Sequence, residues 1–214
     1  MEITWYGHSC FRLIERGMAA VVTDPYDATA VGFAPLKLRA DIVTISHEAA
    51  GHNYLEAVKG VKHVINGPGE YEIGGVFITG FNTNGRKRKQ DEPKNTLYLF
   101  DFDPLTVLHL GDLRRVPSQS EIESLGEVHI VLVPVGGGGA LKPAQAAEVI
   151  GLLEPKVVIP MHYRTEHTTL DLLPLQKFLK EMGVSGVRNE TTLKITYRQL
   201  PDETQIIVLE PRLA

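Results

Sequence analysis

The sequence contains only one cysteine, Cys10, among its 214 residues. An internal disulfide is therefore excluded, which suits a reducing compartment. No apolar run is long enough to cross a bilayer. The first residues, Met-Glu-Ile-Thr-Trp, also lack the basic and apolar regions of a signal peptide. We therefore expect a cytoplasmic protein that has no contact with membranes.

The sequence also has no excess of positive charge. It contains 22 Lys and Arg residues and 26 Asp and Glu residues, which give a net charge of −4. A general nucleic-acid binder usually presents a basic face, so we expect none here. The basic residues do gather in Arg86-Lys87-Arg88-Lys89, and Arg114-Arg115 follow later. These two groups favour a small anionic substrate or ligand, although a solvated loop explains the first run equally well.

The distribution of apolar residues predicts an α/β protein. With 43% hydrophobic and 22% charged residues and no linker or repeat, residues 1–214 are expected to form a single domain. Short apolar runs predict strands at Ile3–Tyr6, Cys10–Ile14, Ala20–Thr23, Ile42–Ile45, Val64–Ile65, Tyr71–Ile73, Val76–Thr79, Thr96–Phe102, Thr106–Leu110, Ile130–Pro134, Val157–Pro160, Leu193–Tyr197 and Gln205–Leu209. Helices are expected from Ser118 to Leu125, from Pro143 to Leu153, and from Asp171 to Met182. Hairpins followed by strand–helix alternation predict two packed sheets with helices outside.

A short bend, Ser46-His-Glu-Ala-Ala-Gly-His-Asn53, follows one of these strands. His47 and His52 frame it as paired metal ligands do, but between them only Glu48 could also coordinate. Polar clusters end three other strands: Thr23-Asp24-Pro25, His109-Leu110-Gly111-Asp112 and Pro160-Met161-His162-Tyr163. Each alone is explained by a turn or a structural histidine. Together they indicate a mixed imidazole and carboxylate metal site.

These motifs, in this order and together with Gly7-His8-Ser9, resemble the metallo-β-lactamase superfamily. The resemblance covers nearly the whole chain and is strongest to small single-domain Zn-dependent hydrolase-like proteins, relatives of the ascorbate-phosphate lactonases. It implies a four-layer αββα sandwich, in which two facing sheets are flanked by helices. It also implies a metal site at one edge, between the sheets.

The resemblance further implies a metal site that is partly lost. The family signature is His-x-His-x-Asp-His, in which His47 matches the first histidine and His52 the last. Asp112 matches the bridging aspartate and His162 the final histidine. The second histidine and the aspartate of the signature are replaced by Ala49 and Gly51, and residues 83–85 lack the remaining histidine. The metal candidates are therefore His52, Asp112, His162 and His47, which would hold at most one zinc or manganese ion; a metal-free protein is the alternative.

No catalytic residue follows from the sequence, but several residues are candidates for binding substrate. Alternation along a strand would place His8 and Cys10 on one face, with Cys10 buried and His8 facing the substrate or supporting the metal ligands. Candidates for contacting an anionic substrate are His8, Arg86, Arg88, Arg114 and Tyr163.

Two functional hypotheses follow. The first is a hydrolase with an eroded binuclear site that acts on an anionic ester or lactone. The second is a catalytically inactive relative that binds a small anionic ligand or a protein partner. An oligomeric scaffold is a third, weaker hypothesis, and the sequence leaves the oligomeric state open.

Overall fold

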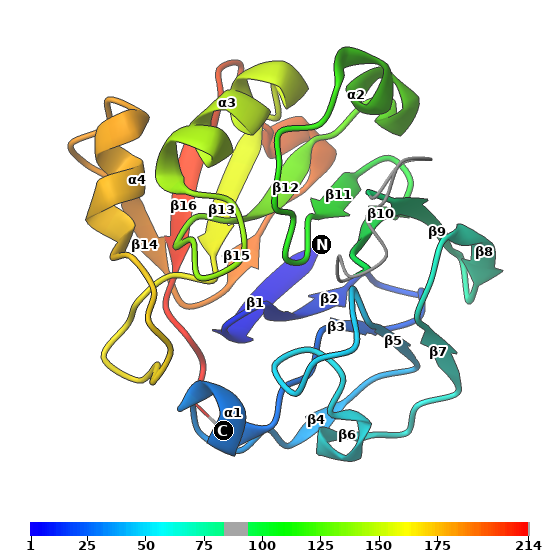
Figure 1. The fold of residues 1–214 in the computed structure, drawn as a ribbon. Helices are drawn as coiled ribbons and strands as arrows, with labels where there is room; N and C mark the ends of the chain where they lie inside the picture. Colours follow the sequence, from blue (N-terminus) through cyan, green and yellow to red (C-terminus); the bar gives the residue numbers. More distant parts are fainter. Residues whose placement is uncertain (84–93, 214) are drawn as a thin grey trace.

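Two β-sheets face each other across a shared apolar core in the computed structural model, which describes residues 1–83 and 94–213 (Figure 1). The first sheet has the strand order β15 (Leu193–Lys194), β1 (Glu2–Gly7), β2 (Cys10–Ile14), β3 (Val21–Thr23), β5 (Ile42–Thr44) and β7 (His63–Ile65). The second has the order β14 (Arg188–Glu190), β16 (Gln205–Leu209), β13 (Val157–Met161), β12 (Ile130–Pro134), β11 (Thr106–His109), β10 (Thr96–Asp101), β9 (Val76–Asn82) and β8 (Gly69–Ile73).

Helices cover the outer face of the second sheet (Figure 1). They are α2 (Gln119–Leu125), α3 (Pro143–Leu153) and α4 (Leu175–Glu181). The predicted capping box begins α2, where the backbone N–H of Ser118 donates to Glu121 Oε2 at 2.8 Å. Proline at the first position opens α3, as predicted. The expected αββα sandwich is confirmed, with two facing sheets and helices outside them.

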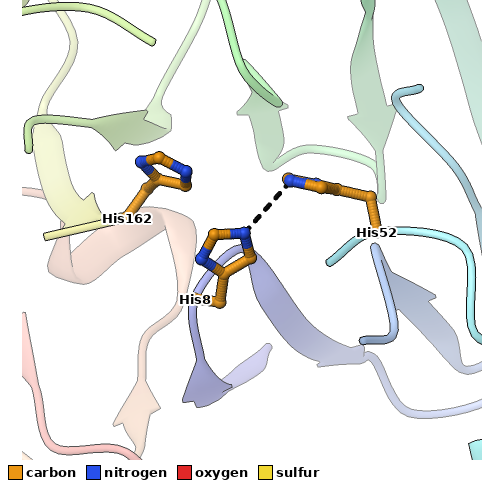
Figure 2. A group of neighbouring side chains, drawn as sticks. All are labelled: His8, His52 and His162. Carbon is orange, nitrogen blue, oxygen red and sulfur yellow. Dashed lines mark hydrogen bonds between the residues drawn. The ribbon is translucent and has the colours of Figure 1, made fainter. Parts of the chain in front are cut away.

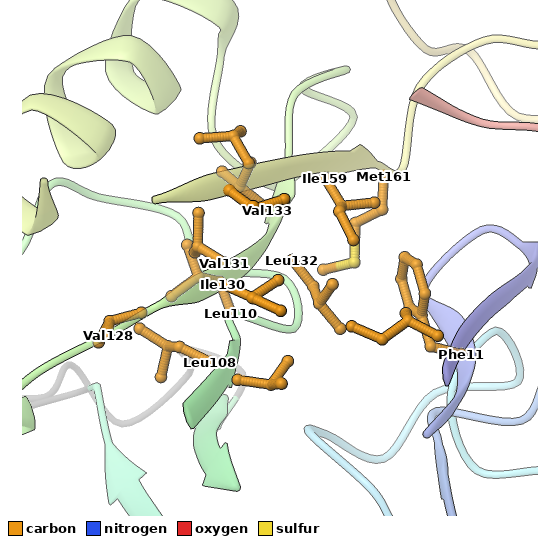
Figure 3. Packing of buried hydrophobic residues seen from close by; sticks show 14 of the residues in the cluster. Phe11, Leu108, Leu110, Val128, Ile130, Val131, Leu132, Val133, Ile159 and Met161 are labelled. Atoms are coloured by element: carbon orange, nitrogen blue, oxygen red, sulfur yellow. The ribbon is translucent and has the colours of Figure 1, made fainter. Parts of the chain in front are cut away.

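The outer face of the first sheet is covered differently, by short elements. They are the helix α1 (Ala28–Val31), the 3₁₀ turn η1 (Leu55–Ala57) and the paired strands β4 (Leu38–Arg39) and β6 (Val58–Lys59). Alternation along the strands divides their side chains between two cores. Ile3, Phe11, Val21 and Ile42 join the core between the sheets, where Figure 3 shows Phe11 beside residues of the second sheet. Cys10, Val22 and Val43 face the outer cluster, so Cys10 is buried as expected.

Parallel pairing brings several strand ends to one edge of the sandwich. β3 pairs in parallel with β5, and β11, β12 and β13 run parallel to one another. The segments that follow these strands therefore leave the sheets on the same side. The predicted polar clusters after β3, β5, β11 and β13 meet at this edge.

Some predicted elements differ from the structure. The helix expected from Asp171 begins only at Leu175, with Pro174 at its N-cap. The preceding residue pairs with the glycine loop instead, because the N–H of Leu173 donates to the carbonyl of Gly136 at 2.8 Å. The strand expected at Leu193–Tyr197 ends at Lys194, and a 3₁₀ turn, η2 (Tyr197–Gln199), follows shortly after. Among the described residues, no helix combines the length and apolar character needed to cross a membrane.

Candidate metal centre

Asp112 lies at the centre of a cluster that it forms with His47, His52 and His162. Each of its two carboxylate oxygens faces an imidazole nitrogen. Its Oδ2 lies 3.6 Å from Nε2 of His47 and 3.5 Å from Nε2 of His52. Its Oδ1 lies 3.4 Å from Nε2 of His162. The structure thus brings together the four residues that the sequence proposed as metal ligands, from the segments after β5, β11 and β13.

His8 joins this cluster from the turn between β1 and β2 (Figure 2). Its Nε2 lies 3.1 Å from Nε2 of His52, and its ring centroid lies 4.4 Å from that of His162. The expectation that His8 and Cys10 share a strand face is wrong. The strand register shifts between Trp5 and Gly7, and His8 adopts a left-handed backbone with φ of 49°. The side chain therefore points to the cluster by way of the turn, not by strand alternation.

The backbone of this turn is tied to neighbouring site residues. The N–H of His162 donates to the carbonyl of His8 at 3.1 Å. The Nε2 of His109 donates to the carbonyl of Ser9 at 2.9 Å, while its Nδ1 accepts from the N–H of Gly111 at 3.2 Å. His109 is therefore a buried structural histidine that connects the end of β11 to the turn carrying His8.

Asp24 orients His52. Its Oδ2 accepts a hydrogen bond from Nδ1 of His52 at 2.8 Å. Ser46 fixes the carboxylate through its N–H, which donates to Oδ1 at 2.7 Å, and its hydroxyl, which donates to Oδ2 at 2.6 Å. A carboxylate on one ring nitrogen directs the other nitrogen toward a metal. The sequence marked Asp24 only as a strand-end polar residue, and its pairing with His52 is visible only in three dimensions.

Asn95 holds the segment that carries Asp112, and the sequence did not indicate it. Its Oδ1 accepts from the N–H of Asp112 at 2.9 Å, and its Nδ2 donates to the carbonyl of Leu110 at 3.1 Å. Gly111 between them has φ of 53° and lies against Asn95 and Ser46, which leave no space for a Cβ. The backbone from Leu110 to Asp112 thus depends on the missing side chain of Gly111 and on the hydrogen bonds of the Asn95 amide.

Burial and charge act in opposite directions on the ionisable groups of the cluster. Burial disfavours the charged form of His52, but Asp112 and Asp24 outweigh it and raise its pKa to about 10. Burial also opposes ionisation of Asp112, yet the charges of His52 and His162 hold its pKa well below the usual value. For His8 and His162, burial is the largest effect and lowers the pKa. Burial thus favours the neutral form of His8 and His162, which is the form in which an imidazole binds a metal.

Near the positions where the sequence departs from the family signature, the residues that the structure describes offer no other ligand. Glu48 is exposed, and its Oε2 accepts a hydrogen bond from Nδ2 of Asn53 at 2.8 Å. Thr83 is buried and its hydroxyl donates to the carbonyl of Asn95 at 2.9 Å. Residues 84 and 85, where the remaining histidine was sought, lie outside the described residues.

The candidate substrate residues differ in their surroundings. Arg114 is exposed, and its charge adds to the effects of burial and of His52 in lowering the pKa of His47. Its neighbour Arg115 instead pairs with Glu121, with Nη2 2.6 Å from Oε1. Tyr163 is buried, and its ring centroid lies 5.3 Å from that of Trp5. Arg86 and Arg88 lie outside the described residues.

The spacing of these side chains suits a metal ion. Ligands placed tetrahedrally about 2.05 Å from zinc lie about 3.3 Å from one another. The four pairs of nitrogen and oxygen atoms measured above are separated by 3.1 to 3.6 Å. Within the described part of the chain, Oδ1 of Asp112 and Nδ1 of His8 are buried without a hydrogen-bond partner. Imidazole and carboxylate donors suit zinc and manganese, so these residues fit a divalent metal.

Several known proteins are similar to this chain. Residues 2–162 match the family described as beta-lactamase superfamily domain. A crystal structure of a candidate Zn-dependent hydrolase of the metallo-beta-lactamase superfamily from Thermotoga maritima is 37% identical, with a TM-score of 0.78 over 97% of each chain. A UPF0173 protein of Pyrococcus abyssi is 28% identical over 188 residues, which cover 77% of this chain and 84% of the relative. A UPF0173 metal-dependent hydrolase of Thermococcus onnurineus is 25% identical over 193 residues, which cover 77% and 85%.

Proposed function

Because the chain belongs to the beta-lactamase superfamily, we propose that it binds one divalent metal, zinc or manganese, and hydrolyses a small anionic ester or lactone. The names of its relatives, among them a metal-dependent hydrolase and a candidate Zn-dependent hydrolase, support this class of reaction. A single domain spanning residues 1–214 and a cytoplasmic location remain part of the proposal.

The main support for this proposal is that both carboxylate oxygens of Asp112 face imidazole nitrogens in a buried pocket. His52 and His162 approach them at 3.5 and 3.4 Å, and Oδ1 accepts no hydrogen bond from the described residues. A buried carboxylate oxygen without a partner costs free energy, which a bound cation would offset. The three residues that would hold the metal are therefore His52, Asp112 and His162.

A divalent metal in this position would supply Lewis acidity and lower the pKa of a water molecule toward neutrality. The residues of the chain would prepare the site. Asp24 holds Nε2 of His52 toward the pocket, and Asn95 holds the backbone of Asp112. For the anionic group of the substrate, Arg114 is an exposed cation whose charge acts on His47. Arg86, Arg88 and Tyr163 remain candidates for further substrate contacts.

The alternative is a catalytically inactive relative that binds an anion or a protein partner. The loss of ligands at Ala49 and Gly51 favours it, since the signature carboxylate is absent and Glu48 is bonded to Asn53 instead. This alternative predicts that inorganic phosphate raises the melting temperature without any turnover.

Activity measurements with metal-loaded protein distinguish the two functions. The wild type would be assayed on phosphodiester, phosphomonoester and lactone substrates beside His162→Ala and the matched control His63→Ala, whose histidine is exposed in β7. The proposal expects turnover in the wild type and in His63→Ala, and loss of turnover in His162→Ala. Equal rates in wild type and His162→Ala, or no turnover by metal-loaded wild type, would contradict it.

A further inference from the structure

Residue 51 is a glycine, and the side chain of His8 occupies the space where a side chain at position 51 would lie. A Cβ atom built on Gly51 would lie 2.9 Å from Nε2 of His8, closer than Cβ atoms approach other atoms in real structures. The family signature has an aspartate at this position. The imidazole of His8 and a side chain at position 51 therefore exclude each other unless one of them moves.

His8 is held there by the fold. Its carbonyl accepts hydrogen bonds from Nε1 of Trp5 and from the N–H of His162, both at 3.1 Å. The residue is 3% exposed and keeps a left-handed backbone, a conformation that costs free energy for most residues. A strained and buried position of this kind persists only when the surrounding structure requires it.

Nε2 of His8 lies close to the other candidate ligands. One ligand nitrogen each from His8, His52 and His162 lies within 4.8 Å of the other two. The Nε2 atoms of His8 and His52 are 3.1 Å apart (Figure 2), near the separation of about 3.3 Å for two ligands on one tetrahedral zinc. Nδ1 of His8 is buried with no partner among the described residues, so no hydrogen bond fixes the ring in another role.

We propose that His8 is a metal ligand, which takes the place of the signature carboxylate lost at Gly51. This proposal rests on the proposed function, since it assumes that the cluster binds a metal. The ion is then held by His8, His52, His162 and Asp112. An imidazole replaces a carboxylate, so the ligand set carries one negative charge fewer than the family site. The water-orienting role of that carboxylate is not replaced, which predicts a site that binds metal well and catalyses slowly.

Cobalt binding to the metal-free full chain tests the proposal, because Co²⁺ reports its ligands by visible absorption. The main variant is His8→Asn, since asparagine tolerates the left-handed backbone, and His63→Ala is the control. Loss of a supporting residue typically weakens metal binding 10- to 100-fold, so loss of a ligand is expected to raise the Kd by about 100-fold or more. The absorption spectrum of the residual complex is expected to change, while His63→Ala behaves as wild type.

A double variant removes the imidazole at position 8 and places a carboxylate at position 51, where the family signature has its aspartate. In His8→Asn/Gly51→Asp the smaller side chain at position 8 leaves space for the carboxylate, so cobalt affinity is expected to recover relative to His8→Asn. In Gly51→Asp alone the new side chain competes with His8, and no gain over wild type is expected. A double variant that binds no better than His8→Asn would contradict the exchange of positions.

A measurement on the wild type covers the case in which the variants do not fold. X-ray absorption of the zinc-loaded chain counts imidazole ligands, and three are expected, against two if His8 is not bound. Unchanged cobalt affinity and spectrum in folded His8→Asn, or two imidazoles on zinc, would overturn the role of His8 and leave the proposed function standing. Failure of the wild type to bind cobalt or zinc would overturn both.

Discussion

The Nε2 atom of His8 lies 3.1 Å from Nε2 of His52. His8 lies in the turn after β1 and His52 in the segment after β5, two strands that are separated by β2 and β3 in the first sheet. Their contact occupies the space beside Gly51. If His8 is a metal ligand, as proposed, it takes over the ligand position that the family signature has at residue 51.

Replacing Asp24 by asparagine should weaken metal binding. The carboxylate holds Nδ1 of His52 at 2.8 Å, and an amide would hold it less strongly and without charge. We expect the Kd for zinc to rise by about 10- to 100-fold, the range found for residues that orient metal ligands. Isothermal titration of Asp24→Asn measures it, with the exposed Asp202→Asn as control. Equal affinities for wild type and Asp24→Asn would contradict this role.

His47 and His162 should differ in importance, because His162 belongs to the metal position that keeps more of its ligands. We expect His162→Ala to lose the bound metal and His47→Ala to retain about one equivalent with modestly lower affinity. Metal content after gel filtration distinguishes them. The reverse result, metal lost only in His47→Ala, would place the ion between His47, His52 and Asp112, which also lie within ligand distance of one another.

The Glu121 carboxylate should make stability depend on pH in acid. Its hydrogen bond with Arg115 lowers its pKa from the usual value to about 2. A carboxylate whose pKa is lower in the folded state stabilises the fold above its unfolded pKa of about 4.3, and this contribution is lost as the pH falls toward 2. The melting temperature of Glu121→Gln should therefore lie below that of wild type at pH 6 and approach it as the pH falls toward 2. A difference that stays constant with pH would contradict the ion pair.

Tyr163 should contribute to stability through its ring. It is buried and packs on Trp5 with ring centroids 5.3 Å apart. We expect Tyr163→Ala to lower the free energy of unfolding by about 3 to 5 kcal/mol, as for other buried aromatic residues, and Tyr163→Phe to change it by less than about 1.5 kcal/mol. Urea unfolding of the metal-free variants measures both. A large loss in Tyr163→Phe would show that the hydroxyl, not the ring, matters.

Much of the fold was predictable because local signals and tertiary packing agree. The capping box at Ser118, the proline that opens α3 and the glycine pair at the β8–β9 hairpin each coincide with the observed element. The helix expected from Asp171 starts later because Pro174 caps it and Leu173 pairs with Gly136. That pairing joins residues far apart in the sequence, which local patterns do not report.

The candidate metal centre could be predicted only in part, because some of its contacts join residues that are far apart in the sequence. His47, His52, Asp112 and His162 follow apolar strands in a recognisable order, so their motifs could be read directly. Asn95, which holds the backbone of Asp112, belongs to no recognisable sequence motif. Its role depends on a contact between the segment before β10 and the segment after β11. For His8 the strand alternation was misleading, because the turn at Gly7 changes the direction of its side chain.

The metal content of the purified full chain shows whether the cluster around Asp112 binds a metal ion. Protein produced in medium supplemented with zinc and manganese would be dialysed, and its metals measured by elemental mass spectrometry against the protein concentration. We expect about one equivalent of a single divalent metal in the wild type and far less in His162→Ala. A wild-type content well below one equivalent would contradict it.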